Sequence, residues 1–331
     1  MHAKQVRSIP LVVALLVGFA CALLPAQPAS AQAPAKSLGS LVLGSGIDAS
    51  YASIVVGVRK GFFKNHGIDA ELKVFASGQE ALDAVLTGQA DFAGNGQYNV
   101  PLVAAKGGNI KIIAEFESST QQFGAVARTG IDKPQDLIGK KVGTQFNTTP
   151  EYYYRLYLRK YGLDPKQINL INVQFAQLAP AIARGDIDAF FAFDPHLTRA
   201  IAAAPGVHIL HRSGQDNVMK LRVYAGVSQK VYSNKDLAVA FLRGLGEAGA
   251  WANAHQDETA QLINEEFKIP IEDAKKYVRY FDYSLTLDKP SRDELAQVSE
   301  YLVQQKVVPS APDLSKFVTT EFMQVAYPGR T

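Results

Sequence analysis

Residues 143–151 read Gly143-Thr144-Gln145-Phe146-Asn147-Thr148-Thr149-Pro150-Glu151. This stretch joins an expected strand at residues 141–144 to an expected helix that begins at Pro150. Thr148 and Glu151 have the spacing of a capping box, in which the hydroxyl accepts from an amide of the first turn and the carboxylate reaches back to the cap. Such a helix start can bind a small anion without lysine or arginine, because it combines free amides with a positive dipole end. The alternative interpretation is an ordinary cap in a strand-to-helix turn.

The beginning of the chain has the features of an export signal. Lys4 and Arg7 precede an apolar run over residues 11–20, and Ala29-Ser30-Ala31 is a small-residue cleavage site. The run is too short for a convincing membrane span, and no later segment is long and uncharged enough to be one. We therefore predict a signal peptide at residues 1–31, a mature chain from about Gln32, and a periplasmic location.

Cys21 is the only cysteine and lies inside the apolar run. A lipoprotein signal usually has Leu three residues before its cysteine, whereas this chain has Gly18, so we expect no lipid anchor. A mature chain without Cys21 has no thiol, which excludes disulfides, thiolate catalysis and cysteine-ligated metals. The histidines lack metal-ligand spacing as well, so neither a metal nor a cofactor is expected.

The length and composition indicate a globular protein of two domains. The chain has 331 residues, of which 47% are hydrophobic and 20% charged. The formal charge is +3 and falls to +1 without residues 1–31, which hold two basic and no acidic residues. With neither a basic run nor a basic-aromatic stripe, we expect no nucleic-acid partner.

Short apolar runs alternate with amphipathic segments from residue 41 to residue 203, which predicts parallel sheets covered by helices on both faces. The pattern occurs twice, and each time a helix closes on a glycine and an aspartate leads into the next strand, at residues 88–91 and 185–188. Two related α/β lobes fit this repetition, with mostly helical sequence after residue 232. The strands are expected at 41–43, 70–76, 91–94, 110–116, 123–128, 141–144, 168–175 and 187–193, and the helices at 51–64, 79–87, 98–106, 150–161, 179–184 and 195–203.

Five phrases carry a resemblance to a known family. They are Gly-Gln-Glu-Ala-Leu-Asp-Ala-Val-Leu-Thr-Gly at 78–88, Asp-Phe-Ala-Gly-Asn-Gly at 91–96, Asp-Leu-Ile-Gly-Lys-Lys-Val at 136–142, Arg-Gly-Asp-Ile-Asp-Ala at 184–189 and Phe-Asp-Pro at 193–195. In order and spacing they resemble the solute-binding proteins of ABC importers for taurine, alkanesulfonates and nitrate, over most of residues 38–230. The resemblance implies a two-lobed periplasmic binding protein of type II, in which each lobe is a doubly wound, mainly parallel sheet. We expect lobe 1 at 36–120 plus 225–331, lobe 2 at 121–224, and hinge crossings near 118–123 and 218–225.

The ligand of such a protein lies outside the carboxyl ends of the strands, where loops lead into helices. The loops here offer neutral donors and aromatic side chains, which suit a small ligand with one anionic head. By the resemblance, Thr148 and Thr149 match a Ser/Thr-rich helix start that receives a sulfonate or similar oxyanion. Two departures stand out: several relatives have Trp at the position of Phe193 and a short small-residue loop at 97–99. The expected ligand-binding residues are Ser50, Tyr51, Gln79, Asn95, Gln97, Tyr98, Thr144, Asn147, Thr148, Thr149, Phe193 and Asp194.

Some of these residues have structural alternatives. Asp194 can pair with a ligand amine or cap the helix at Pro195. Gln79 can be an ordinary first-turn residue, and Gly78 and Gly96 can be plain turn residues. Four tyrosines between 152 and 157 cover adjacent faces of one helix, so at most two of them can face a cleft.

The resulting hypothesis is a monomeric, non-enzymatic protein that captures a small organic anion, most simply an aliphatic sulfonate such as taurine, and delivers it to an ABC permease in the inner membrane. Uptake of an aromatic acid or a thiamine-pyrimidine precursor is the alternative, favoured by Tyr51, Tyr98 and Phe193. An extracytoplasmic sensor is a further alternative. An enzyme like the fungal thiamine-pyrimidine synthases fits less well, because those enzymes use a cysteine-rich motif.

Overall fold

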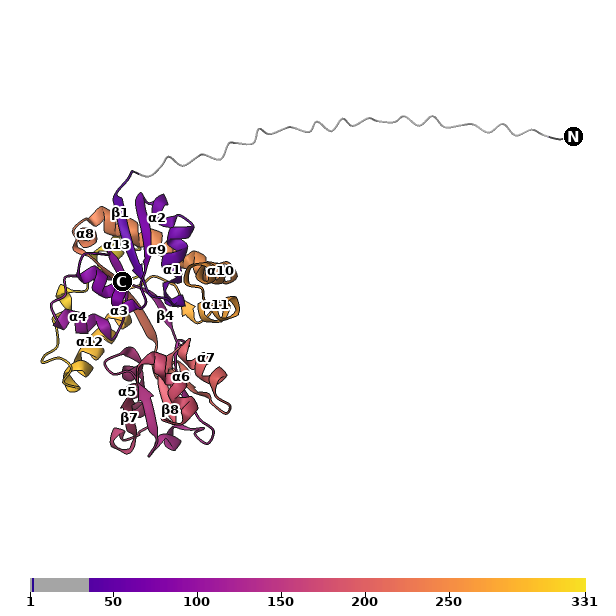
Figure 1. Cartoon of the computed structure of the whole chain (residues 1–331). Helices are drawn as coiled ribbons and strands as arrows, with labels where there is room; N and C mark the ends of the chain where they lie inside the picture. The colour runs from indigo at the N-terminus through magenta and orange to yellow at the C-terminus, as the bar shows by residue number, and fades with distance from the viewer. Residues whose placement is uncertain (1, 3–35) are drawn as a thin grey trace. The chain divides into compact units, whose positions relative to one another are not determined.

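The computed structural model describes His2 and residues 36–331, which form two β-sheets with helices around them (Figure 1). The expected signal peptide, with Cys21, lies outside the described residues. No helix in the described part of the chain has both the length and the apolar character needed to cross a bilayer.

The first sheet has the strand order β11-β4-β10-β3-β1-β2. β1 pairs in parallel with β2 and β3, whereas β10 pairs antiparallel with both β3 and β4, so four of the six strands run the same way. The strands are β1 (Gly39–Ser45), β2 (Ile68–Val74), β3 (Phe92–Gly96), β4 (Lys111–Ser119), β10 (Leu221–Val227) and β11 (Phe281–Asp282).

The second sheet has the order β7-β6-β8-β5-β9. β6 pairs in parallel with β7 and β8, and β5 pairs antiparallel with β8 and β9. Four of its five strands therefore share one direction, as expected for a mainly parallel sheet. The strands are β5 (Phe123–Ala127), β6 (Lys141–Thr144), β7 (Asn169–Asn172), β8 (Ala189–Phe193) and β9 (His208–Arg212).

The chain passes from the first sheet to the second between Ser119 and Phe123, and it returns between Arg212 and Leu221. The first passage matches the crossing expected near 118–123. The second expected crossing, 218–225, overlaps β10, which is a central strand of the first sheet with partners on both sides. The division into lobes at 120 and 225 stays a prediction.

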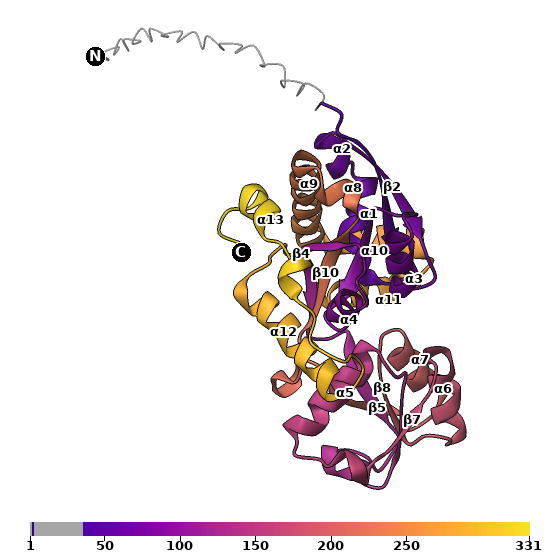
Figure 2. The same ribbon diagram turned by 90° about the vertical axis from the view of Figure 1, so that its left-hand side faces the viewer.

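Helices cover both sheets, and Figure 2 shows α12 extending from the helices around the first sheet toward α5 of the second. The ring centroids of Tyr152 on α5 and Tyr301 on α12 lie 4.8 Å apart. The helices are α1 (Ala52–Arg59), α2 (Phe62–Asn65), α3 (Gly78–Leu86), α4 (Asn99–Ala105), α5 (Thr149–Lys160), α6 (Phe175–Arg184), α7 (His196–Ala203), α8 (Gln229–Tyr232), α9 (Lys235–Ala254), α10 (Gln256–Phe267), α11 (Ile271–Val278), α12 (Lys289–Gln304) and α13 (Glu321–Ala326).

Several expected boundaries were wrong for local reasons. The helix expected at 51–64 is broken at Gly61, whose φ of 77° lies in the left-handed region, so α1 and α2 are separate. The strand expected to run to Phe175 ends at Asn172, and α6 begins at Phe175 itself. Strands β9 and β10 were not anticipated at all.

Candidate functional site

A cavity of about 420 Å³ lies at the carboxyl ends of strands from both sheets. Seven of the expected residues line it: Ser50, Tyr51, Gln79, Asn147, Thr148, Thr149 and Phe193. The wall also contains residues that the sequence did not single out as ligand contacts, among them Asp48, Ser77, Asn99, Gln122, Phe123, Gln145, Phe146, Phe175, Leu221 and Val223.

The start of α5 forms part of the second sheet's side of the wall. The expected capping box is wrong in both halves: the Thr148 hydroxyl donates to the carbonyl of Gln145, and Glu151 Oε2 accepts from the amide of Asn147 at 2.8 Å. Asn147, the residue before the cap, has a φ of 59° and therefore a left-handed backbone conformation. This conformation accompanies the two altered contacts.

The consequence is a set of free donors at the start of α5, where Thr148 and Thr149 line the cavity. The amides of Thr148, Thr149 and Glu151 have no acceptor among the described residues. Thr149 also approaches the first sheet, because a Cβ on Gly96 would lie 3.3 Å from its hydroxyl oxygen. Glu151 carries the nearest negative charge, and Arg155 partly offsets it with a contact of 3.2 Å.

The first sheet contributes a floor built around Tyr51. This side chain is only 3% exposed, and its ring lies against Gly46, Gly78 and Gly94. A Cβ on Gly78 would lie 2.6 Å from the Tyr51 hydroxyl, so glycine is needed there for close packing. Burial raises the pKa of Tyr51, and the nearby Asp48 and Glu117 carboxyls raise it further, so its phenol stays neutral.

Asp48 precedes Tyr51 and caps the short 3₁₀ helix η1 (Ala49–Tyr51). Its Oδ1 accepts from the amide of Ser50 at 2.7 Å. Burial raises the pKa of Asp48, while the hydrogen bonds from Ser50 act in the opposite direction. Among the described residues of the wall, Asp48 is the one acidic residue, and there is neither lysine nor arginine.

Aromatic rings form the remaining wall on the second sheet's side. The Phe193 ring packs edge-on against Phe123 at 5.9 Å and against Phe175 at 4.9 Å between centroids. Phe146, in the loop before α5, is 37% exposed. Residues 143–151 already contained Phe146, but no local pattern pointed to Phe175, because its segment was expected to be a strand end.

Four expected residues lie outside the wall and use their side chains within the fold. Asn95 Nδ2 donates to the carbonyl of Ala93 at 2.9 Å, and Thr144 Oγ1 donates to that of Phe191 at 3.0 Å. Gln97 joins the end of β3 to the start of β10, since its Nε2 donates to the carbonyl of Lys220 and its Oε1 accepts from the amide of Arg222. Tyr98 is 2% exposed and packs with Tyr152.

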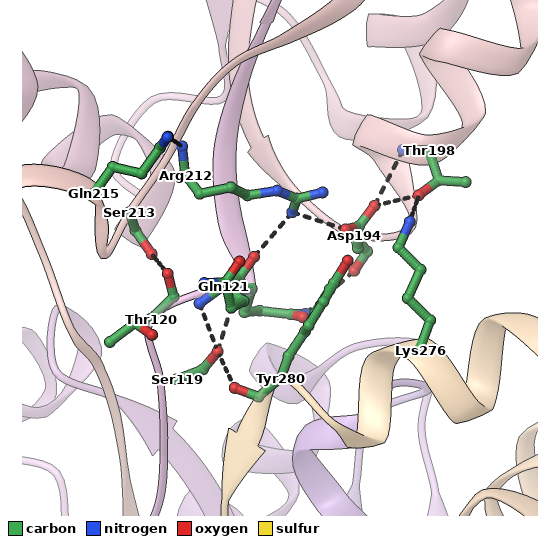
Figure 3. A network of polar contacts seen from close by, with 11 residues as sticks. Ser119, Thr120, Gln121, Asp194, Thr198, Arg212, Ser213, Gln215, Lys276 and Tyr280 are labelled. Atoms are coloured by element: carbon green, nitrogen blue, oxygen red, sulfur yellow. Dashed lines mark hydrogen bonds and ion pairs between the residues drawn. The ribbon is translucent and has the colours of Figure 1, made fainter.

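Asp194 also lies outside the wall, at the centre of a polar network (Figure 3). Its Oδ1 accepts from the amide of Thr198 at 3.0 Å and from the Thr198 hydroxyl at 2.7 Å, which is the capping role. Its Oδ2 binds Arg212 at 2.8 Å. Lys276 of α11 reaches the same Thr198 hydroxyl at 3.1 Å. This geometry favours the structural alternative for Asp194 over a ligand-amine contact.

Comparison with known proteins identifies the family. Residues 48–259 match the family model described as NMT1/THI5 like. The chain belongs to the NMT1/THI5-like family. In sequence it is similar to the taurine-binding periplasmic protein of Escherichia coli (strain K12), with 23% identity over 276 residues that cover 80% of this chain and 86% of the relative.

Solved structures show the fold of this NMT1/THI5-like protein. The periplasmic aliphatic sulphonate binding protein SsuA from Escherichia coli matches with a TM-score of 0.75 at 17% identity, covering 85% of this chain and 92% of that one. The desulfurization enzyme DSZB matches with a TM-score of 0.65 at 16% identity, covering 86% of this chain and 98% of that one. The chain therefore has the two-lobed fold of the SsuA-type periplasmic binding proteins, and this fold also occurs in an enzyme.

Proposed function

We propose that this NMT1/THI5-like protein is the extracytoplasmic solute-binding component of an ABC importer and binds a small organic anion in the cavity between its two sheets. The observation that carries the proposal is the start of α5, where Thr148 and Thr149 line the cavity and their amides have no acceptor among the described residues. Backbone amides at a helix start bind an oxyanion without a countercharge from lysine or arginine.

The leading ligand is an aliphatic sulfonate such as taurine. A sulfonate has three acceptor oxygens. It can therefore bind several convergent donors at once, which a ligand with a single acceptor cannot do. The similarity to a taurine-binding protein supports this choice of head group. Nitrate is a smaller oxyanion that the same donors can bind.

The aromatic wall supports the second candidate, an aromatic acid or a thiamine-pyrimidine precursor. Phe123, Phe146, Phe175 and Phe193 offer ring faces and edges to a planar ligand. A cavity of about 420 Å³ falls in the range of sites for drug-sized ligands, so it has space for a body larger than that of taurine.

The transport role requires binding and closure but no chemical step. Moving a two-state protein from almost fully open to almost fully closed takes on the order of 5 kcal/mol of differential affinity, and a micromolar ligand releases about 8 kcal/mol in binding. In the part of the chain that the structure describes, the cavity wall contains no cysteine, histidine or lysine to act as a nucleophile or base. We accordingly propose a monomeric, periplasmic binding protein whose macromolecular partner is the membrane permease.

A thermal-shift screen of the chain from Gln32 onward tests this function. The panel contains taurine, short alkanesulfonates, nitrate, bicarbonate, aromatic carboxylates and pyrimidines. A true ligand at a hundredfold excess over its Kd stabilises the fold by about 2.7 kcal/mol, which raises the melting temperature visibly. A shift with sulfonates supports the leading ligand class, and a shift with aromatic acids or pyrimidines alone supports the second candidate. Absence of a shift with every compound would contradict the proposal.

A further inference from the structure

Helix α11 contacts segments that belong to both sides of the cavity. On the first sheet's side it packs against η1, which carries Ser50 and Tyr51 of the wall. The hydroxyl of Tyr283, which follows α11, lies 3.1 Å from the carbonyl of Ala49 in η1 and 3.3 Å from that of Val278 in α11. The position of this part of the wall is therefore tied to that of α11.

The contact of α11 with the second sheet's side is made by Lys276. Its Nζ donates to Oγ1 of Thr198 in α7 at 3.1 Å (Figure 3). The Thr198 hydroxyl in turn donates to Oδ1 of Asp194 at 2.7 Å. Asp194 directly follows Phe193, which lines the cavity. Two consecutive hydrogen bonds thus connect α11 to the residue next to the aromatic wall.

A second contact between the same parts of the molecule involves Arg212 and Tyr280. Arg212 of β9 binds Asp194 Oδ2 at 2.8 Å, and its guanidinium carbon lies 5.4 Å from the centre of the Tyr280 ring, shortly after α11. The carbonyl of Tyr280 accepts from Ser119 Oγ at 2.7 Å, where the chain leaves the first sheet. Lys276 and Tyr280 therefore approach the Asp194 network from the first sheet's side.

The position of these contacts links them to the completeness of the cavity. Each contact, like the cavity itself, has one side on each sheet, so a movement that separates the sheets breaks the contacts and opens the cavity together. Interactions present in the binding arrangement raise its population. The apparent affinity for any ligand rises in proportion to that population.

We propose that Lys276 is a positioning residue for ligand affinity. Together with Tyr280 it forms a clasp on Asp194, Thr198 and Arg212, and this clasp stabilises the arrangement in which both sides of the cavity face the ligand. Lys276 lies outside the cavity wall, so it should change the affinity for every ligand by the same factor. This inference rests on the proposed function and adds to it a determinant of affinity that does not touch the ligand.

Titration calorimetry on matched lysine variants tests the clasp. Lys276→Met removes the ammonium group, and Lys275→Met makes the same change at the neighbouring residue, which pairs with Glu272 inside α11 at 2.9 Å. Taurine, nitrate and benzoate serve as probes. We expect Lys276→Met to weaken the binding of each probe that binds by one common factor of about threefold to tenfold, as for the loss of one hydrogen bond. Lys275→Met should leave these affinities within about 1.5-fold.

A double-mutant cycle with Thr198→Val establishes whether this contact carries the effect. If Lys276 acts through the Thr198 hydroxyl, Lys276→Met should weaken binding less in the Thr198→Val background than in the unmodified protein. Lys276→Arg keeps a charged donor at this position and should retain most of the affinity. Melting temperatures establish that all variants are folded.

A distance measurement tests the clasp without any ligand. Spin labels are attached at Glu71→Cys on β2 and at Lys166→Cys in the 3₁₀ helix η3 (Pro165–Gln167) before β7, two exposed positions on either side, in a Cys21→Ser chain. Double electron-electron resonance then reports the distance between the two parts. Lys276→Met should broaden the distance distribution of the ligand-free protein, and Lys275→Met should leave it unchanged.

The outcomes separate the clasp from the function on which it rests. Equal affinities in Lys276→Met and Lys275→Met, losses that differ more than about threefold between two probes that bind, or an unchanged distance distribution in Lys276→Met would each overturn the clasp while leaving ligand binding in place. No binding by any of the three probes would contradict the proposed ligand class, and the distance distribution would then decide on the clasp by itself.

Discussion

Helices α3 and α5 both begin at the cavity, and both begin with a hydroxyl residue followed three positions later by glutamate. In α3 both side chains of the pattern accept hydrogen bonds from backbone amides at the helix start. Ser77 Oγ accepts from the amide of Glu80 at 3.2 Å, and Glu80 Oε2 accepts from the amide of Ala76 at 3.3 Å. Its first-turn donors are therefore partly satisfied by its own side chains.

In α5 only the hydroxyl forms a different contact. Thr148 donates backward to Gln145, whereas Glu151 accepts from the amide of Asn147, the residue before the cap, as Glu80 does from Ala76. The amide of Glu151 therefore has no acceptor among the described residues, whereas the corresponding amide of Glu80 binds Ser77. Each helix start keeps further amides at the cavity that have no acceptor in the described part of the chain, those of Thr148 and Thr149 in α5 and those of Gly78 and Gln79 in α3. The comparison teaches that a capping side chain removes one amide from a set that can otherwise hold an anion.

Replacing Thr148 and Thr149 together by Val should have the largest effect. Two groups that position or donate to a charged ligand are lost, so anion affinity should fall by about 3 kcal/mol, or roughly a hundredfold, while the fold is retained. Titration calorimetry measures the affinity, and thermal melting shows whether the fold is retained. Unchanged affinity in this double variant would remove α5 as the anion site and with it the contrast to α3.

Lowering the pH should destabilise the packing of α5 against His211 and should affect α3 less. Tyr153 of α5 contacts His211 Nδ1 at 2.6 Å, and Tyr161 contacts the other ring nitrogen at 2.9 Å. Burial lowers the pKa of His211 to about 4. Since the unfolded chain takes up the proton near pH 6.5, the stabilisation is complete above that pH and is lost as the pH falls toward 4.

The expected loss from His211 between pH 7.5 and pH 5 is about 2 kcal/mol of unfolding free energy. Denaturant titrations at the two pH values measure it, and hydrogen exchange locates it in α5. Burial also lowers the pKa of His196 to about 4, so His196→Gln and His211→Gln variants separate the two contributions. Equal pH dependence in the protein and in His211→Gln would exclude His211 as the cause.

Substitution of Gly78 by Ala tests the packing that positions α3. The new methyl group would meet the Tyr51 hydroxyl, so we expect a loss of about 1 to 2 kcal/mol of stability from overpacking. Gly96→Ala is the matched control at the α5 side, where the nearest atom is the Thr149 hydroxyl at a longer distance. Greater destabilisation by Gly96→Ala in urea unfolding would contradict the assigned packing.

The smallest effect is expected for Ser77→Ala. Loss of the α3 cap should cost about 1 kcal/mol of stability, with anion affinity changed by less than about threefold. Chemical denaturation and calorimetry on the same preparation check both quantities. An affinity loss as large as that of the Thr148 and Thr149 double variant would show that both helix starts contact the anion.

The sequence by itself determined the features that depend on neighbouring residues. The alternation of strands and helices up to residue 203, the junction of β6 with α5 and the loops after β1 and β3 follow from local hydrophobic period and turn residues. These features, with the five family phrases, were sufficient to predict the two-lobed α/β fold and seven residues of the cavity wall.

The tertiary structure alone decided the contacts that join distant parts of the chain. Strand β10 finds its place through pairing with β3 and β4, more than a hundred residues earlier, and its own sequence gave no sign of this. Thr144, Gln97 and Asp194 have the side chains of binding residues, yet each is occupied by a partner that only folding brings near. Local sequence fixes which groups are available, but the long-range contacts decide which of them remain free for a ligand.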